Sequence, residues 1–180
     1  MKKLLVTIML VVGIFTAYGQ HLEIEGIQID GPIQKFEAKL LQKGFEPIDM
    51  SKFNIGNTPM RSYIGKILGY DGLLHVIYDP KSGTVYRCVV DHIYNKKHIA
   101  DLVSEAIGIK LGKLYKDQCS KFVKDKQIPT VVYNIEGYDP ETGGTMVLGD
   151  ITVSVSKRGE KYYTEAVYSD MSNMLTFFDK

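Results

Sequence analysis

The chain has 180 residues, of which 44% are hydrophobic and 24% are charged, a composition typical of a soluble globular domain. A chain of this length buries roughly two-thirds of its unfolded surface, so it can form a core without metals or many disulfides. Length and composition therefore predict one folded domain and exclude a chain that is disordered throughout.

The N-terminal residues have the pattern of an export leader. Two lysines follow the first methionine, an almost unbroken apolar run covers residues 4–17, and small residues precede a cleavage site after Gly19. We expect a signal peptide over residues 1–19, a new terminus at Gln20, and a single mature domain over residues 20–180 in the periplasm or outside the cell. An uncleaved anchor is disfavoured because the run is shorter than the roughly 20 residues of a spanning helix.

The charge balance of the mature chain argues against one class of partner. The whole chain has 22 basic and 21 acidic side chains, and the leader contains two of the basic ones and no acid, which leaves 20 basic side chains and a net charge near −1. Nucleic-acid binding requires a basic footprint. The lysines gathered within residues 110–126 are explained more simply as a solvated helix face. We therefore expect no nucleic-acid partner, and no membrane span once the leader is removed.

Periodic patterns along the mature chain predict strands and two helices. In chain order we expect a short strand over 22–29, an amphipathic helix over 33–43, strands over 61–68, 73–78 and 84–94, a long amphipathic helix over 99–115, and strands over 130–136, 151–156 and 161–168. Short turns between the strands make an antiparallel arrangement. The predicted fold class is α+β, a largely antiparallel sheet with the two amphipathic helices packed on one face.

Several single residues sharpen these expectations. Asp30 is placed to cap the first helix, Gly44 to end it in a left-handed conformation, and Asn95 to cap the second. Leu41 and Leu102 fall on the predicted apolar faces of the two helices. The segment over 118–127 has no clear pattern, and the tail from Met171 onward is apolar enough that we expect it to dock on the domain.

A turn sequence occurs twice. Residues 78–83 read YDPKSG and residues 138–143 read YDPETG. Two related halves that share one sheet would produce this echo. Independent selection would produce it too, because turn chemistry favours Asp, Pro and Gly. Both explanations stay open.

Residues 26–31 read GIQIDG, and a helical segment and a Lys-Gly-Phe sequence over 43–45 follow them. This arrangement resembles the N-terminal signature of small exported proteins of Bacteroidetes, which have a G-I-P-I-D-G-like turn, a helix and K-G-F. The GDITV sequence over 149–153 and the long second helix are similar as well. The chain departs from that pattern at Gln28, where the family commonly has proline, and over 118–127. The resemblance implies an α+β organisation and assigns no site residues.

No motif in the sequence signals a catalytic, metal or cofactor site. The four histidines, His21, His75, His92 and His98, lack the spacing of zinc ligands. No G-x-S-x-G sequence occurs, and the Gly-Gly pair at 143–144 has no helix start behind it to bind phosphate. We therefore expect no cofactor and assign no catalytic, cofactor-binding or metal-binding residues.

The two cysteines leave two alternatives. In an oxidising compartment Cys88 and Cys119 allow one internal disulfide. Spacing alone cannot show that their Cβ vectors meet, so two thiols that pack as small hydrophobes remain the other reading.

Tyrosine is the enriched residue type, with 12 tyrosines and no tryptophan. Tyrosine suits half-buried sheet positions, and it also suits recognition surfaces. Tyr162 and Tyr163 must lie on opposite sides of their strand, so at least one can lie outside the core. An open sheet face without catalytic motifs favours an exported binding or inhibitor-like module that recognises a protein or a surface glycan. A small envelope hydrolase with a site assembled from scattered residues, and a structural accessory of an envelope complex, are the alternatives.

Overall fold

The computed structural model describes residues 21–49, 59–125, 130–139 and 142–178. The expected signal peptide over 1–19 and the junction between Gly19 and Gln20 lie outside these residues. Both stay predictions.

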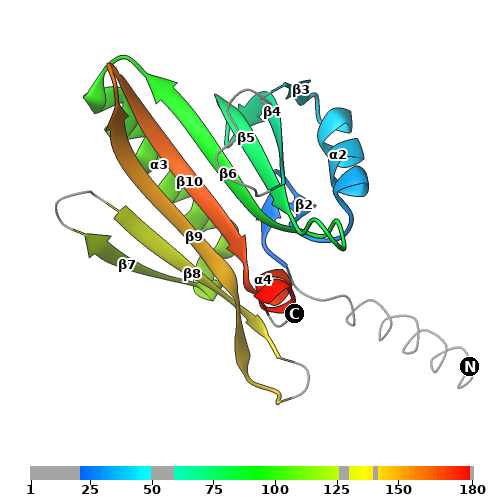
Figure 1. Ribbon diagram of the computed structural model, residues 1–180. Helices are drawn as coiled ribbons and strands as arrows, with labels where there is room; N and C mark the ends of the chain where they lie inside the picture. Colours follow the sequence, from blue (N-terminus) through cyan, green and yellow to red (C-terminus); the bar gives the residue numbers. More distant parts are fainter. Residues whose placement is uncertain (1–20, 50–58, 126–129, 140–141, 179–180) are drawn as a thin grey trace, which may run out of the picture.

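An eight-stranded antiparallel sheet with strand order β3-β4-β5-β6-β10-β9-β8-β7 dominates the described structure (Figure 1). Its strands are β3 (Glu46–Ile48), β4 (Met60–Ile67), β5 (Tyr70–Tyr78), β6 (Val85–Tyr94), β7 (Cys119–Asp125), β8 (Thr130–Tyr138), β9 (Thr145–Arg158) and β10 (Lys161–Asp170). The meander predicted over 61–94 is confirmed as β4, β5 and β6, which pair in sequence. The largely antiparallel sheet is confirmed as well.

Helices and a small hairpin accompany the sheet. They are the hairpin strands β1 (Glu23–Ile24) and β2 (Ile27–Gln28), the helices α2 (Ile33–Gln42), α3 (Lys97–Tyr115) and α4 (Met171–Phe178), and a 3-10 turn over Lys116–Gln118. The domain is therefore mostly β, with a large antiparallel sheet and a few helices, in agreement with the α+β class. The apolar tail forms α4, and it contacts β6, β9 and β10.

The strand predicted over 22–29 is a tight hairpin instead. Glu25 and Gly26 have φ values of 51° and 69°, which is the left-handed region that a two-residue hairpin turn requires. Ile24 pairs with Ile27 across that turn. The irregularity in the alternating pattern at Gly26 is the turn itself.

The helix ends differ from the sequence prediction at their first residues. Neither α2 nor α3 has a side-chain cap. Asp30 instead accepts a hydrogen bond from Asn173 Nδ2 at 3.2 Å, and Asn95 accepts one from Lys161 Nζ. Gly44 has the predicted left-handed conformation, with φ at 82°. Asp30 and Asn95, which the local sequence predicts as helix caps, therefore form hydrogen bonds with residues far away in the sequence instead.

Two leucines predicted to pack are exposed. Leu41 is 48% and Leu102 is 59% exposed, because each helix buries a narrower stripe than its full apolar pattern. The segment over 118–127 contains β7, which lies at the edge of the sheet and pairs with β8. Its lysines are typical of an edge strand that resists pairing with another chain. They also interrupt the alternation of apolar and polar residues, so the sequence pattern did not predict this strand.

Cross-strand pairing defines two faces of the sheet. One face, called here the buried face, contains a row that runs from β4 to β9 through Tyr63, Leu74, Val90, Ala166 and Val153. Each of these side chains is at most 1% exposed. The opposite side, called here the polar face, contains Ser62, His75, Asp91, Glu165 and Ser154 in the alternating positions.

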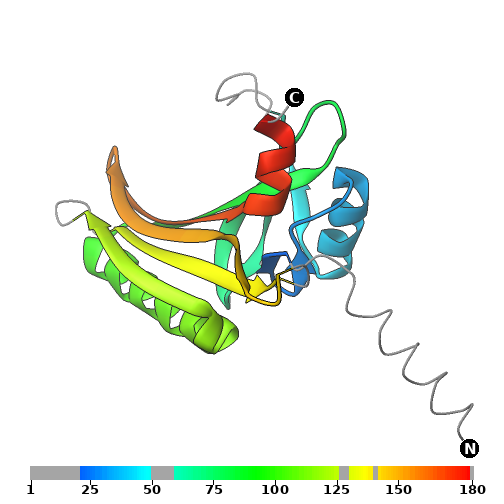
Figure 2. The same cartoon turned by 90° about the horizontal axis from the view of Figure 1, so that it is seen from below.

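Polar contacts connect two helices to the buried face. Thr164 Oγ1 donates a hydrogen bond of 2.8 Å to the carbonyl oxygen of Ala100 in α3. Tyr63 Oη donates one of 3.1 Å to Glu37 in α2. Figure 2 shows α3 and α4 on opposite sides of the sheet, and Arg87 on the polar face contacts the sulfur of Met174 in α4 at 3.8 Å.

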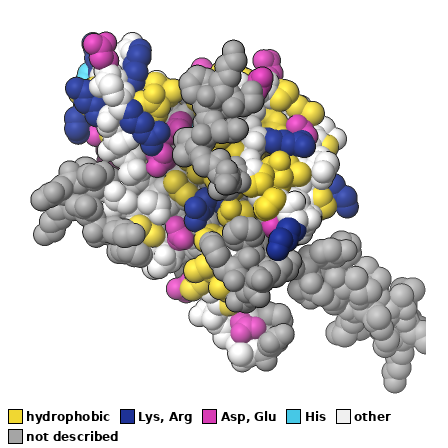
Figure 3. Space-filling view, viewed as in Figure 1, with side chains coloured by type: hydrophobic (Ala, Val, Ile, Leu, Met, Phe, Trp, Pro, Cys, Tyr) yellow, Lys and Arg dark blue, Asp and Glu magenta, His cyan; other side chains and the backbone are white. Residues whose placement is uncertain are grey.

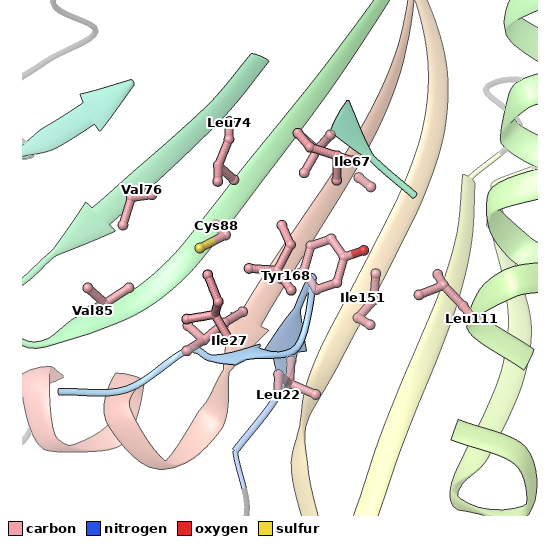
Figure 4. Close-up of a cluster of buried hydrophobic side chains, with 14 of the residues drawn as sticks. Leu22, Ile27, Ile67, Leu74, Val76, Val85, Cys88, Leu111, Ile151 and Tyr168 are labelled. Atoms are coloured by element: carbon pink, nitrogen blue, oxygen red, sulfur yellow. The ribbon is translucent and has the colours of Figure 1, made fainter. Parts of the chain in front are cut away.

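Tyr168 on β10 occupies the centre of the core (Figure 4). It is 1% exposed and pairs with Cys88 on β6 and Ile151 on β9. Leu22, from the segment before the hairpin, packs on the same side and is fully buried (Figure 4). The core therefore joins strands from both halves of the chain with its N-terminal hairpin.

The order of elements repeats once along the chain. α2 precedes β3 to β6, α3 precedes β7 to β10, and the two units meet where β6 pairs with β10. The two turns with similar sequences contain equivalent hydrogen bonds. Asp79 N–H donates to Thr84 O in the first, and Asp139 N–H donates to Gly144 O in the second, both at 2.9 Å. However, these turns occupy the last connection of the first unit and the middle connection of the second. Turn chemistry therefore explains the sequence echo, and the repeated element order is a separate observation.

Candidate functional site

A group of polar side chains lies on the polar face where β4, β5 and β6 run side by side. Ser62 Oγ lies 2.8 Å from His75 Nδ1, and His75 Nε2 lies 3.7 Å from Asp91 Oδ2. The side chains of His75 and Asp91 are only 13% and 10% exposed. The register of three neighbouring strands brings these residues together although 29 positions separate the first from the last.

Arg158, at the end of β9, joins this group from the other half of the sheet. Its guanidinium donates a hydrogen bond of 2.6 Å to Glu165 and lies 3.8 Å from Asp91 Oδ2. The same group lies 4.8 Å from the ring centre of Tyr163, a cation–π distance. The hydrogen bond to Glu165 is the main cause that raises the pKa of Arg158, although burial opposes it. Two carboxylates and one ring thus hold a half-exposed arginine in place.

Three buried side-chain atoms of the polar face have no hydrogen-bond partner among the described residues, and two of them lie near Arg158. Within the described residues, Asp91 Oδ1 and Ser156 Oγ accept and donate no hydrogen bond. Ser156 pairs with Tyr163 across β9 and β10, so both atoms belong to the region around Arg158. Such orphaned groups in a folded protein call for a partner, which can be water, an ion or a binding molecule.

Apolar side chains flank the charged group. Ile64 and Ile93 are 44% and 43% exposed, and their cross-strand partners Leu73 and Tyr163 place them on the polar face. Figure 3 looks onto this side of the molecule and shows hydrophobic side chains interspersed with acidic and basic ones between the grey atoms. We call the set Ile64, His75, Asp91, Ile93, Arg158, Tyr163 and Glu165 the polar-face cluster.

The serine–histidine pair lacks the surroundings of a hydrolase. Ser62 is 4% exposed, so a substrate carbonyl has little access to its hydroxyl. The 3.7 Å separation of His75 and Asp91 is longer than a hydrogen bond. β4 pairs with strands on both sides, β3 and β5, so its backbone N–H groups serve the sheet and are not free to bind an oxyanion.

The two cysteines are free thiols. Cys88 is on β6 and Cys119 begins β7, and three strands lie between them in the sheet. At roughly 4.8 Å per strand this separation is about 19 Å, far beyond the reach of a disulfide. The bond considered from the sequence therefore does not form in this fold. Burial raises the pKa of both thiols, so neither is an activated nucleophile.

The described residues contain no group of three or more His, Cys, Asp or Glu side chains that could hold a metal ion. Across the same described ranges, none of the helices combines the length and the apolar character that a membrane crossing needs.

The structure places some of the tyrosines in the core and others outside it. Tyr63, Tyr133 and Tyr168 are core residues, each at most 4% exposed. Tyr162 and Tyr163 lie on opposite sides of β10, as alternation predicts, and Tyr163 belongs to the polar-face cluster. The sequence predicts only that His75 lies in a strand, and nothing in the sequence indicates a functional role for Asp91, Arg158 or Glu165. Strand alternation could have assigned them to one face, but their neighbours depend on a register that the sequence does not reveal.

A scan against family models finds no match to the chain, and searches among curated proteins and solved structures find no similar protein.

Proposed function

We propose that the chain is an exported binding module that recognises another protein through the polar face of its sheet. In this proposal α2 and α3 both pack on the buried face, and the part of the polar face that α4 does not contact is the recognition surface. The mature domain over residues 20–180 acts in the periplasm or outside the cell, in keeping with the resemblance to small exported proteins of Bacteroidetes.

The observation that carries the proposal is the fixed position of Arg158 over Tyr163. Arginine and tyrosine are the residue types that most often dominate protein interfaces. Glu165 and Asp91 already order the guanidinium, so binding costs less side-chain entropy than with a free arginine. Because the guanidinium covers one face of the Tyr163 ring, a protein partner fits better than a stacked sugar.

The chain offers a matched pair of variants to test this. Arg158 and Tyr163 form a cation–π pair on the polar face at 4.8 Å, and Lys157 and Tyr162 form one at 5.7 Å on the other side of the same turn. The tagged domain and both double alanine variants are used to capture proteins from native envelope extracts. We expect a stoichiometric partner with the wild type and with K157A/Y162A, and its loss with R158A/Y163A.

With that partner purified, removal of Arg158 and Tyr163 should weaken the affinity by about 30-fold or more, the effect of a hot spot. A partner retained equally by both double variants would contradict the proposal, and so would one lost equally from both.

The contact between Ser62 and His75 supports a second candidate, the small envelope hydrolase. A fluorophosphonate probe reacts with activated serines whatever their substrate. Labelling that disappears in both S62A and H75Q would establish this candidate. We expect no labelling of Ser62, because it is buried and lacks free backbone donors nearby.

A further inference from the structure

A cleft lies on the other side of the sheet from the polar-face cluster. Its volume is about 420 Å³, and it separates α3 from β7, β8 and β9. This volume is within the range of small-molecule sites. Gly108 on α3 shapes one wall, because an added Cβ would lie 2.3 Å from the hydroxyl of Tyr133 on β8. The missing side chain lets that ring reach the helix.

The floor of the cleft is aliphatic and rigid. Val131, Val153 and Val155 line it together with Tyr133. Val153 and Val155 are 1% and 8% exposed, and both belong to the long strand β9, paired on both sides. A floor of this kind favours an aliphatic body over a polar one.

Two acidic side chains of α3, Asp101 and Glu105, and one basic side chain of β7, Lys121, line the cleft. Glu105 on α3 makes no hydrogen bond or ion pair with any described residue, whereas its neighbour Asp101 is bound by Lys97 at 2.8 Å. Lys121 on β7 lies 5.8 Å from the Tyr133 ring centre and forms no ion pair within the described part of the chain. An unpaired carboxylate and an unpaired ammonium group at one apolar cleft are complementary to a molecule with both charges.

From this geometry we infer that the cleft binds a small zwitterion with an aliphatic body, of the class of a short apolar peptide with free ends. Its ammonium group lies at Glu105, its carboxylate lies at Lys121, and its side chains lie on Val131 and Val153. This site is independent of the polar-face cluster, so either proposal can fail without the other.

The test uses leucyl-leucine as the probe, with N-acetyl-leucyl-leucine and leucyl-leucinamide as forms that lack one charge each. The full chain is expressed, purified and labelled at valine methyl groups for NMR titration. We expect leucyl-leucine at millimolar concentration to shift the signals of Val131 and Val153. Each blocked form should bind about two- to fivefold more weakly, as expected for one partly exposed ion pair.

Variants assign each charge to its partner. E105Q should weaken leucyl-leucine about two- to fivefold and leave the acetylated form unchanged, and K121Q should do the same with the amide form unchanged. E160Q is the matched control for Glu105, and K157Q is the control for Lys121, because Lys157 also lies over a tyrosine ring. Absence of shifts at Val131 and Val153, equal affinity for the blocked forms, or equal effects of the control variants would overturn the inference.

Discussion

Neighbouring residues of one strand belong to two very different surfaces. On β6, Val90 is 1% exposed and faces the hydrophobic core, and the next residue, Asp91, has a buried carboxylate oxygen without a partner. On β10, Ala166 lies in the core, and the residue before it, Glu165, holds Arg158. The buried face is mostly apolar, although His92 Nε2 on it also has no hydrogen-bond partner among the described residues, whereas the polar face carries ordered charges and several such atoms. In the function proposed above, one face of the sheet would provide stability and the other recognition.

The largest expected effect is on the buried face. Tyr168→Ala removes a ring at the centre of the core (Figure 4) and should lower the free energy of unfolding by about 3–5 kcal/mol, because it leaves a cavity. Urea denaturation measures the change. Tyr163→Ala, on the polar face, is the control and should cost less than about 1 kcal/mol. Similar losses of stability in Tyr168→Ala and Tyr163→Ala would contradict the difference between the buried face and the polar face.

A smaller loss of stability is expected at Gly149 on β9, where the neighbouring strand leaves no room for a side chain. A Cβ on Gly149 would lie 2.1 Å from the carbonyl oxygen of Ser169 and 2.8 Å from Leu22. Gly149→Ala should therefore destabilise the domain by about 1–3 kcal/mol through overpacking. Gly144→Ala, in an open turn where the nearest atom is 3.4 Å away, is the matched control and should stay within about 0.5 kcal/mol of wild type. An unchanged midpoint for Gly149→Ala would mean that the strands can separate there.

His92 should make stability fall in acid. Its side chain is fully buried on the buried face, and Nδ1 donates to the carbonyl oxygen of Asp71 at 3.0 Å. Burial is the main cause that lowers the pKa of His92 below its usual value of 6.5. The neutral ring is therefore favoured by folding, and its contribution is present above pH 6.5 and lost as the pH falls below that value, by up to about 1.4 kcal/mol for each pH unit.

Denaturation of wild type and His92→Phe across this range measures the effect. The variant should show a flatter decline below pH 6.5. An identical decline in both proteins would assign the acid sensitivity to other groups.

His21 should act in the opposite direction. The hydrogen bond from its ring to Asp170 is the main cause that raises the pKa of His21 above 6.5, with Asp30 also near. Folding therefore favours the protonated ring. Its contribution is complete below pH 6.5 and is lost as the pH rises through the raised value. His21→Gln should reduce stability more at acidic than at alkaline pH, and an equal loss at both would show that charge is not involved.

The sequence predicted the parts of the fold that depend on local pattern. The meander of β4, β5 and β6 and the long helix α3 follow from alternation, turn residues and helical spacing. β7 was missed because charged residues interrupt its pattern at an exposed edge. The N-terminal hairpin was mistaken for one strand because a two-residue turn at Glu25 and Gly26 looks like a slip in alternation.

The candidate site could not be predicted from the sequence, for a different reason. Ser62, His75 and Asp91 come from three strands, and Arg158 comes from the far half of the chain. The contact of Arg158 with Asp91 depends on the pairing of β6 with β10, which joins residues 68 to 82 positions apart. Alternation assigns each residue to a face, but long-range register decides which residues meet.

The most direct test of the central claim measures stability and partner retention on the same protein, the R158A/Y163A variant. The account predicts a free energy of unfolding within about 1 kcal/mol of wild type together with loss of the captured partner. A variant that unfolds readily, or one that keeps its partner, would contradict the assignment of recognition to the polar face.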